Sequence, residues 1–345
     1  MTDACVSQMV LYVIGLGLAD EQDVTLRGLK AMQGSERVYL EAYTSIFMAE
    51  GAVDRMQELI GKPVRLAHRE TVELEADDIL ELAGTADVSF CVVGDPLSAT
   101  THTDLILRAR HRSPPIPVKV IHNASIMTAL ASSGLAAYNF GQTISVPFWS
   151  ETWKPDSWLE RIGENVKVGL HTLCLGDIKV REQSEEDMAR GIQRYQDPRY
   201  MLIPQLISQI TTADTEHSTS YIPADRTLAV ALCRMGANDE LIVSGTLSEL
   251  LALASGPGQG TPEAAQEEEA DEALADENGW GEKELAKHRA ARAEQRALKV
   301  YGKPLHSLVL VGRRLHPLER EYAGMYKVPG SRWDEVAKEA YGCES

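Results

Sequence analysis

Short apolar runs alternate with amphipathic segments over the first 120 residues of the chain. The runs rich in β-branched residues read as strands and cover residues 10–15, 37–43, 88–93 and 118–121. Between them, apolar residues recur at helical spacing in 25–34, 46–60, 72–83 and 103–110. A run that is apolar throughout, such as VSFCVV at 88–93, is typical of a strand covered on both faces. The alternation predicts an α/β fold with a parallel, doubly wound sheet.

The pattern after about residue 141 is less regular. Strand-like runs cover 143–148, 172–176, 228–233 and 308–311, and helical spacing is found in 183–195, 200–211 and 247–254. This order predicts a second α/β domain with a mixed sheet. We therefore expect four parts in the chain: a flexible tail over 1–8, an N-terminal domain over 9–141, a C-terminal domain over 142–330, and a C-terminal tail over 331–345.

A low-complexity insert, residues 255–302, interrupts the second domain. Its first part, 256–280, is rich in Gly, Pro, Ala and Glu and carries only acidic charges, whereas 281–301 contains six lysines and arginines. An acidic stretch with few large apolar residues cannot bury a core. We therefore expect the first part to lack ordered structure and the second part to form a charged helix.

The composition of the chain disfavours several classes of function. The chain has 345 residues, 44% of them hydrophobic, and a net charge of −17. That charge disfavours nucleic-acid binding as the main task, and also adhesion to anionic membranes. No run of about 18 apolar residues could span a bilayer, and residues 1–8 lack the basic start of a secretory signal. The five cysteines are far apart and form no C-x-x-C pair, which indicates a reduced, cytoplasmic protein.

Polar and glycine-rich segments follow three of the predicted strands. They are Gly15–Leu18, Gly94–Ser98 and Asn123–Ile126. Each alone has a plain alternative as ordinary turn or helix-capping chemistry. Because the carboxyl ends of parallel strands meet at one sheet edge, where ligands bind in open α/β folds, the three segments together predict a binding site.

The first of these segments partly matches the dinucleotide-binding fingerprint G-x-G-x-x-G. Gly15 and Gly17 fit, but the third glycine position holds Asp20, and Glu21 and Asp23 follow. A pyrophosphate at this turn would meet three carboxylates, with no basic residue in the turn to offset them. The turn therefore suits a ligand that carries positive charge, or it is a tight turn with no ligand at all.

Several stretches together resemble the diphthine synthase family, a group in the tetrapyrrole-methylase-like class of S-adenosylmethionine enzymes. The matching stretches are YVIGLGLADEQDVTLRGL, RVYLEAYTS, VVGDPLSATTH, VIHNASIM, FWSETWKPDSW, HTLCLGDIKVREQS, PRYM, CRMGANDELIVSGTL and KPLHSLVLVG. They cover about residues 9–250 and 303–322. The FWSETW and HTLCLGDIKV stretches resemble the eukaryotic type most closely.

The resemblance implies two α/β domains with the cofactor in the cleft between them, a homodimer, and S-adenosyl-L-methionine as methyl donor. It places the cofactor contacts on Leu18, Asp95, Ser98, Ser125, Ile126, Gly176, Met235 and His306. Two positions depart from the family pattern, which usually has glycine at Ser98 and a larger apolar residue at Gly176. No metal is needed, since the sulfonium is already an activated leaving group, and no catalytic residue is assigned.

The resemblance also implies the acceptor, a 3-amino-3-carboxypropyl-histidine of elongation factor 2 that receives four methyl groups to give diphthine methyl ester. One alternative is a methylase acting on a tetrapyrrole precursor of cobalamin or sirohaem. The other is a non-catalytic scaffold that binds partners through its tryptophans and its charged insert.

Three of the five tryptophans, Trp149, Trp153 and Trp158, cluster in WSETWKPDSW. Pro155 would interrupt a helix running through all three, so they are not expected to fill one core layer. Tryptophan is enriched at binding hot spots. We therefore predict that the cluster marks the dimer interface or the rim of the acceptor site, and not the cofactor pocket.

Overall fold

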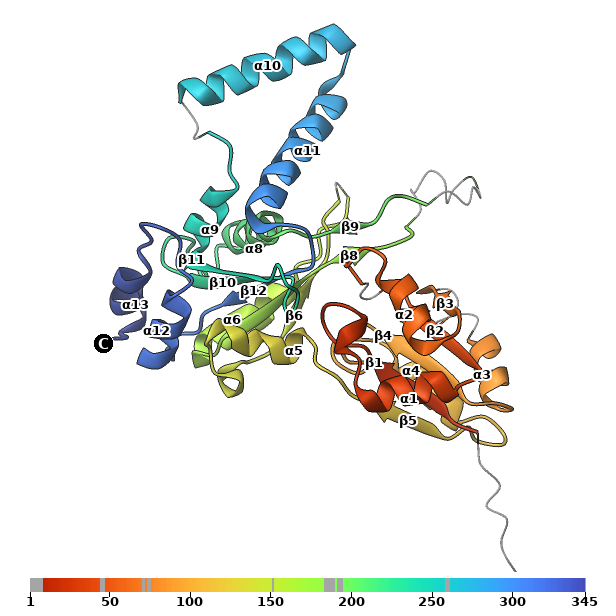
Figure 1. The fold of residues 1–345 in the computed structure, drawn as a ribbon. Coiled ribbons are helices and arrows are strands. Elements are labelled where there is room, and N and C mark those ends of the chain that lie inside the picture. The colour runs from red at the N-terminus through yellow and green to blue at the C-terminus, as the bar shows by residue number, and fades with distance from the viewer. Residues whose placement is uncertain are drawn as a thin grey trace, which may run out of the picture. The chain divides into compact units, whose positions relative to one another are not determined.

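The computed structural model describes residues 9–43, 47–69, 72, 76–150, 152–182, 190, 195–257 and 261–344. The chain divides into two compact units (Figure 1). Unit 1 consists of Met1–Ala129, Ile178–Arg199 and Met235–Asn238, and unit 2 consists of Leu130–Asp177, Tyr200–Arg234 and Asp239–Ser345. The expected tail over residues 1–8 lies outside the described residues.

Unit 1 contains the predicted parallel sheet. Its strands run in the order β3-β2-β4-β1-β5 and all pair in parallel. They are β1 (Leu11–Gly15), β2 (Arg37–Glu41), β3 (Val64–Ala67), β4 (Val88–Val92) and β5 (Val118–Ile121). Strand β3 was not predicted, because it lies at the sheet edge and exposes Arg65 and Leu66, so its sequence lacks an apolar run.

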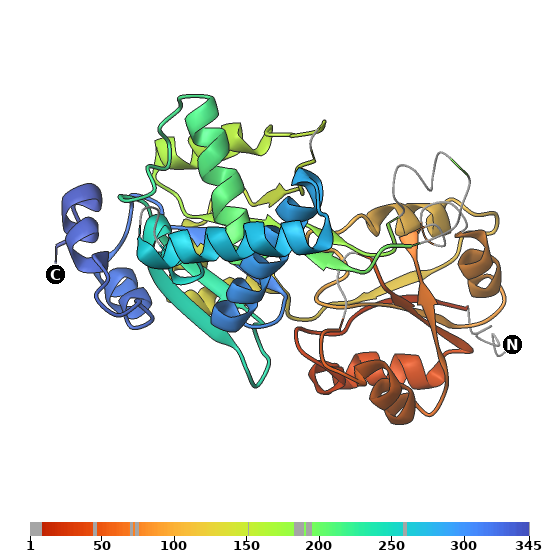
Figure 2. The ribbon, with the colours of Figure 1, turned by 90° about the horizontal axis from the view of Figure 1, so that it is seen from above.

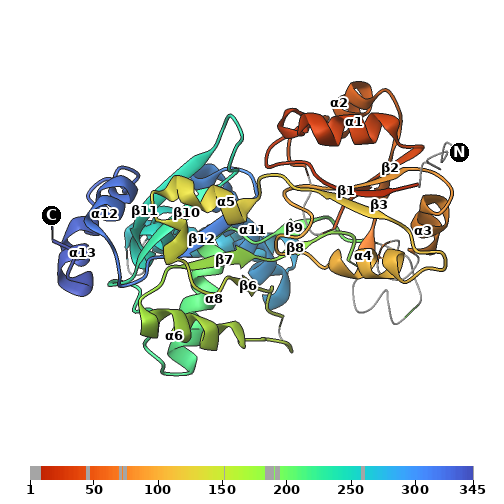
Figure 3. The ribbon, with the colours of Figure 1, turned by 90° about the horizontal axis from the view of Figure 1, so that it is seen from below.

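Helices cover both faces of this sheet, as the pattern predicted. Figure 3 shows α1 (Leu26–Gly34) and α2 (Ala52–Ile60) on one face, and α3 (Asp77–Ala83) and α4 (Thr103–Arg110) on the other. The side chains agree: Met32 and Met56 pack with Ile14 in one cluster, and Leu80 and Leu105 pack with Phe90 in the other.

Unit 2 contains the predicted mixed sheet, in the order β11-β10-β12-β7-β6. Only β6 and β7 pair in parallel. The strands are β6 (Ile144–Val146), β7 (Thr172–Gly176), β10 (Leu228–Cys233), β11 (Leu241–Thr246) and β12 (His306–Leu310). The helices α6 (Trp158–Val168), α8 (Ile203–Glu216) and α9 (Leu247–Leu253) contribute to its main core.

Short elements connect these parts. They are η1 (Glu21–Asp23), α5 (Ile126–Ala129), η3 (Leu130–Ser133), η4 (Ala137–Asn139), and a two-stranded ribbon of β8 (Ile178–Lys179) and β9 (Arg199–Tyr200). The helix predicted over 183–195 falls almost entirely outside the described residues. Cys91, Cys174 and Cys233 are fully buried with free thiols, as expected for small core residues.

The C-terminal residues differ from the expected tail. They form α12 (Pro317–Gly324) and α13 (Trp333–Tyr341), and Trp333 is fully buried, with its indole N–H donating to Arg320 O at 3.0 Å. The amphipathic spacing of α13 buries Val336 and Ala337 beside this tryptophan. Within the described residues, no helix combines the length and apolar character needed to cross a membrane.

The insert differs from expectation in its first part, which is helical and not disordered, whereas its second part is the charged helix that was predicted. Helices α10 (Pro262–Asn278) and α11 (Glu282–Tyr301) form a hairpin, seen in cyan and blue in Figures 1 and 2. Thr261 caps α10 by accepting from Ala264 N–H, and Gly279 ends it with a φ of 66°.

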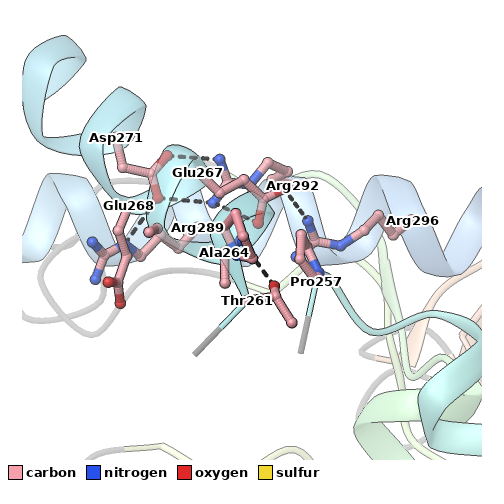
Figure 4. Close-up of a pocket in the computed structure, with 11 residues that line it drawn as sticks. Pro257, Thr261, Ala264, Glu267, Glu268, Asp271, Arg289, Arg292 and Arg296 are labelled. Carbon is pink, nitrogen blue, oxygen red and sulfur yellow. Dashed lines mark hydrogen bonds and ion pairs between the residues drawn. The ribbon is translucent and has the colours of Figure 1, made fainter. Parts of the chain in front are cut away.

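Charge pairing between the helices explains why the acidic part is ordered. The Asp271 side chain is only 2% exposed and accepts from Arg289 at 3.0 Å and from Arg292 at 2.8 Å (Figure 4). Burial by itself would raise the pKa of Asp271, but the two guanidinium groups outweigh that effect and lower it. At the end of α11, Ala297 and Tyr301 join the core of unit 2.

Candidate functional site

The turn after β1 lies directly against the turn after β4. Gly17 N–H donates to Gly94 O at 3.3 Å, and Gly94 N–H donates to Gly17 O at 2.6 Å. A Cβ at residue 15 would lie 2.6 Å from Gly94 O, so this close approach requires glycine. Gly17 has a φ of 90°, a conformation that other residues rarely adopt.

The acidic residues of this turn hold its backbone in place. Asp23 Oδ2 accepts from Leu18 N–H at 2.9 Å and from Ala19 N–H at 2.7 Å. Asp20 caps η1 by accepting from Gln22 N–H at 2.9 Å. Because these carboxylates serve the turn itself, the expectation that they face a cationic ligand needs correction.

The third acid of the turn, Glu21, pairs with a residue that the local sequence does not reveal. Its Oε1 accepts from Arg55 Nε of helix α2 at 2.7 Å. That hydrogen bond outweighs burial and lowers the pKa of Glu21. Glu21 is therefore neutralised in an ion pair and is not an exposed acidic group.

Asp95, after β4, is the centre of the site. Its residue is 6% exposed, and one carboxylate oxygen, Oδ1, accepts from Leu97 N–H at 3.0 Å and from the Ser98 hydroxyl at 3.1 Å. The other oxygen, Oδ2, accepts from His122 Nδ1 at 2.8 Å and from Asn123 N–H at 3.1 Å. Burial would raise the pKa of Asp95, but these hydrogen bonds outweigh it and lower the pKa.

The turn after β5 completes the group. Asn123 Nδ2 donates to Gly15 O and to Asp23 O, each at 3.0 Å. Ser125 is buried and its hydroxyl accepts from Met127 N–H at 3.2 Å, at the start of α5. Since β4, β1 and β5 are neighbours in the sheet, the structure confirms that these three strand ends meet at one edge.

One more predicted residue belongs to unit 1. Met235 is 6% exposed, and the next residue, Gly236, has a φ of 83°. A Cβ at Gly236 would lie 3.0 Å from the Cβ of Leu18. The structure thus brings the Met235–Gly236 turn against Leu18 of the glycine turn. Leu18, Asp95, Ser98, Ser125, Ile126 and Met235 all lie in unit 1.

The two remaining predicted residues lie in unit 2. Gly176 ends β7, and a Cβ there would lie 3.0 Å from Met201 Cβ. Met201 therefore occupies the space that a larger residue at 176 would fill, which gives a physical reason for this departure from the family pattern. The other departure, Ser98, directs its hydroxyl to Asp95 and so closes its own loop.

His306 is the unit 2 residue best suited to contact a ligand. It is 6% exposed, and its Nε2 donates to Lys303 O at 3.0 Å. Burial lowers the pKa of His306 to about 4, so the ring is neutral at pH 7 and Nδ1 is an acceptor. Within the described part of the chain, Nδ1 is buried and has no hydrogen-bond partner. An N–H or O–H donor of a bound molecule would satisfy it.

The tryptophan prediction is wrong for Trp158, which is 4% exposed and belongs to the core of unit 2. Trp149 is half-buried and packs against that core. Both indole N–H groups donate to Pro155 O, at 3.0 and 3.1 Å. The turn at Pro155 lets both rings converge on the same carbonyl without a helix through all three residues. Trp153, 54% exposed, remains a candidate contact residue.

The sequence did not single out two residues that shape the site, His122 and Arg55, which each pair with a carboxylate. Asn123 lies in a predicted segment, and its side chain ties two turns together. The position of His122 directly after a strand was a usable signal. Arg55 gave none, because it is 34 residues from Glu21.

The residues present fit a small molecule without phosphate. The basic side chains that contact the three turns, Arg55 and His122, each face a carboxylate. Apolar side chains at Leu18, Ile126 and Met235 accompany backbone groups held in fixed positions. By themselves, the turns of unit 1 suit a small ligand that binds through apolar contacts and backbone groups. In unit 2, the acceptor on His306 suits an amine or hydroxyl donor.

A scan against family models matches residues 10–251 to the tetrapyrrole (corrin/porphyrin) methylases. Among curated proteins, a diphthine methyl ester synthase of Emericella nidulans is 44% identical over 94% of this chain and 96% of its own length. Those of Saccharomyces cerevisiae, 44% identical over 91% and 88%, and of Mus musculus, 40% identical over 94% and 98%, carry the same description.

Solved structures agree with these sequence matches. A candidate diphthine synthase from Entamoeba histolytica has a TM-score of 0.68 and 34% identity, covering 93% of this chain and 99% of that one. That match spans both units of this chain. The chain therefore belongs to the tetrapyrrole (corrin/porphyrin) methylase family of methyltransferases, in the group that includes the diphthine methyl ester synthases.

Proposed function

We propose that the protein uses S-adenosyl-L-methionine to methylate the 3-amino-3-carboxypropyl-histidine of elongation factor 2, with four transfers that give diphthine methyl ester. The observation that supports this most is the set of three strand-end turns held together around Asp95, in a chain whose relatives are described as diphthine methyl ester synthases. A tetrapyrrole acceptor is the alternative within the same family.

The proposed cofactor contacts divide by unit. Leu18, Asp95, Ser98, Ser125, Ile126 and Met235 would contribute from unit 1, and Gly176 and His306 from unit 2. Bound S-adenosylmethionine supplies a methyl group on a sulfonium, which needs no metal to leave. The backbone groups fixed by Asp95 and Asp23 would position the donor, and His306 Nδ1 would accept from one of its N–H or O–H groups.

The protein's task in the reaction is alignment. Holding the acceptor nitrogen or oxygen in line with the methyl carbon turns a bimolecular step into an effectively unimolecular one. A free α-amine has a pKa of about 7.7–8.0, so a fraction is nucleophilic at neutral pH without a strong base. We assign no general base. The described thiols are buried, and burial raises the pKa of Cys91 and Cys174, so neither is a candidate nucleophile.

One assay separates the two acceptors. Purified protein is incubated with methyl-labelled S-adenosylmethionine and either elongation factor 2 carrying the intermediate or a uroporphyrinogen. We expect label on elongation factor 2 alone, with four methyl groups by mass spectrometry. Label on the uroporphyrinogen would support the tetrapyrrole alternative, and bound cofactor product without transfer to either would contradict both.

We also propose that the protein is a homodimer that meets through α12. Leu318, Tyr322 and Met325 lie at positions i, i+4 and i+7 and are 69%, 47% and 74% exposed. Tyr138, 90% exposed, lies on η4, whose neighbour Asn139 donates to Glu319 of α12. Such an apolar stripe is unusual on a free monomer surface.

The local charge favours a second copy of the chain as the partner for this stripe. Residues 313–327 contain four arginines and lysines and two glutamates, in a chain of net charge −17. Two such acidic chains repel less where they meet through a surface that is not acidic. Tyr322→Lys should shift the protein towards monomer in sedimentation, and an unchanged dimer would exclude this face. Free thiols at the described cysteines support a cytoplasmic location.

A further inference from the structure

Arg181 has a conformation and an environment that its structural neighbours do not explain. It follows β8 and has a φ of 55°, the left-handed region that non-glycine residues rarely occupy. Holding such a residue there strains the backbone, and such strain clusters at functional sites. Arginine gains nothing from this conformation locally, unlike glycine or asparagine.

The acidic residue next to Arg181 pairs with other basic residues and not with Arg181. Glu182 pairs with Lys179 at 2.7 Å and with Arg199 at 3.5 Å, so the nearest acid in sequence already has two cations. Within the described residues, Arg181 forms no ion pair, and its Nε is buried without a hydrogen-bond partner. Its guanidinium carbon lies 4.2 Å from the centroid of the Tyr195 ring.

An arginine that forms no ion pair with any described residue is conspicuous in a chain with 51 acidic and 34 basic residues. Burying a guanidinium donor without an acceptor is unfavourable unless a partner arrives. Stacking on Tyr195 fixes the plane of the guanidinium, and a fixed planar fork matches a carboxylate in two-point geometry. The ligand that this arrangement suits is therefore a carboxylate on a small molecule or flexible side chain.

We propose that Arg181 binds the carboxylate of an α-amino acid group at the methyl-transfer site. The proposal rests on the proposed function, in which two such groups are present: the amino-acid end of the cofactor, and the 3-amino-3-carboxypropyl group of the acceptor. Arg181 belongs to the same compact unit as Leu18, Asp95 and Ser98. In both cases Arg181 would determine specificity, because it recognises a carboxylate. The strand-end turns, which contain acidic residues, would not bind such a group.

Arg181→Asn is the decisive variant. Asparagine removes the charge but tolerates a positive φ, so the thermal midpoint should stay the same or rise. The carboxylate that Arg181 binds belongs to one of these two molecules, so both are measured. A weaker affinity for S-adenosylhomocysteine in calorimetry would identify the cofactor carboxylate. A higher KM for elongation factor 2 carrying the intermediate would identify the acceptor carboxylate. Losing a charge-assisted hydrogen bond corresponds to a change of about tenfold to hundredfold, which we expect in one of the two measurements.

Two controls sharpen the result. Arg332→Asn removes an exposed arginine of unit 2 that pairs with Glu335, and it should leave both measurements unchanged. An S-adenosylhomocysteine analogue without its carboxylate should bind wild type about tenfold to hundredfold more weakly if the cofactor is the source, and should then bind the variant no more weakly than wild type.

Failure of the Arg181 proposal can be told apart from failure of the proposed function. If wild-type protein binds S-adenosylhomocysteine but does not methylate elongation factor 2, the proposed function fails, and calorimetry alone decides on Arg181. An unchanged affinity in the variant would then overturn the proposal. With an active wild type, the proposal is overturned if both measurements are unchanged in Arg181→Asn, or if a lowered thermal midpoint accompanies equal losses in both.

Discussion

Replacing Asp95 by alanine tests whether the three strand-end turns form the cofactor site. The carboxylate accepts four hydrogen bonds, and two of the donors are the backbone N–H groups of Leu97 and Asn123, at 3.0 and 3.1 Å. Alanine leaves both N–H groups without an acceptor. The parallel sheet beneath does not depend on this side chain, so we expect the fold to persist while the turns lose their fixed geometry.

The size of the effect follows from those two donors. One unsatisfied buried donor costs about 1–3 kcal/mol, and since these turns are partly exposed, water offsets part of the loss. We therefore estimate a total cost of about 2–3 kcal/mol for leaving the two N–H groups without an acceptor. If the cofactor must restore the geometry on binding, its Kd rises roughly 30- to 150-fold, at about 1.4 kcal/mol for each factor of ten.

The assay is calorimetric titration with S-adenosylhomocysteine. Asp104→Ala is the matched control, because Asp104 is an acid of the same unit whose side chain is 68% exposed, and its ion pair with Arg108 is long, at 3.8 Å. The control should bind as wild type does. Unchanged affinity in Asp95→Ala, with the thermal midpoint preserved, would refute the assignment of this edge as the cofactor site.

Three further changes test other parts of the structure. Replacing residues 262–294 with a short flexible linker should leave methyl transfer and the thermal midpoint nearly unchanged, because the hairpin pairs its charges internally; a collapse of either would show that the insert supports the fold. Trp153→Ala should lower turnover on elongation factor 2 at unchanged cofactor affinity, whereas Trp158→Ala should destabilise unit 2 by about 3–5 kcal/mol; the reverse pattern in kinetics and thermal unfolding would contradict the placement. Burial lowers the pKa of His102 to about 4, so the unfolded chain takes up a proton near pH 6.5 that the folded chain refuses until about pH 4. Stability should therefore fall as pH drops through that window, and His102→Gln should show a smaller fall by thermal unfolding between pH 7 and 5.

The sheets were predictable because their strands are buried on both faces. VSFCVV and LAVALC are apolar throughout, and both became central strands, β4 and β10. The meeting of three strand ends followed from parallel topology alone. Strand β3 was missed for the converse reason, since an edge strand with Arg65 exposed carries no apolar run.

What the sequence could not supply are contacts between distant residues. Met201 fills the space beside Gly176, and Arg55 neutralises Glu21 across 34 positions. The order of α10 has the same cause. Its acidic composition predicts disorder in isolation, but α11 places Arg289 and Arg292 on Asp271. The negative charge of α10 is compensated by the positive charge of α11. The composition of α10 alone therefore wrongly predicts disorder.

The structure changes the physical reason why the acids of the glycine turn disfavour a dinucleotide. The sequence argued against a dinucleotide because a pyrophosphate would meet Asp20, Glu21 and Asp23. In the structure Glu21 is neutralised by Arg55, so simple repulsion is weaker than that argument supposed. A phosphate at such a turn needs free backbone N–H groups. Asp23 already accepts from the N–H groups of Leu18 and Ala19, at 2.9 and 2.7 Å. The protein's own carboxylate therefore occupies the position that a phosphate would take, and a ligand here must bind through other groups, as a sulfonium with an adenosine and an amino-acid tail can.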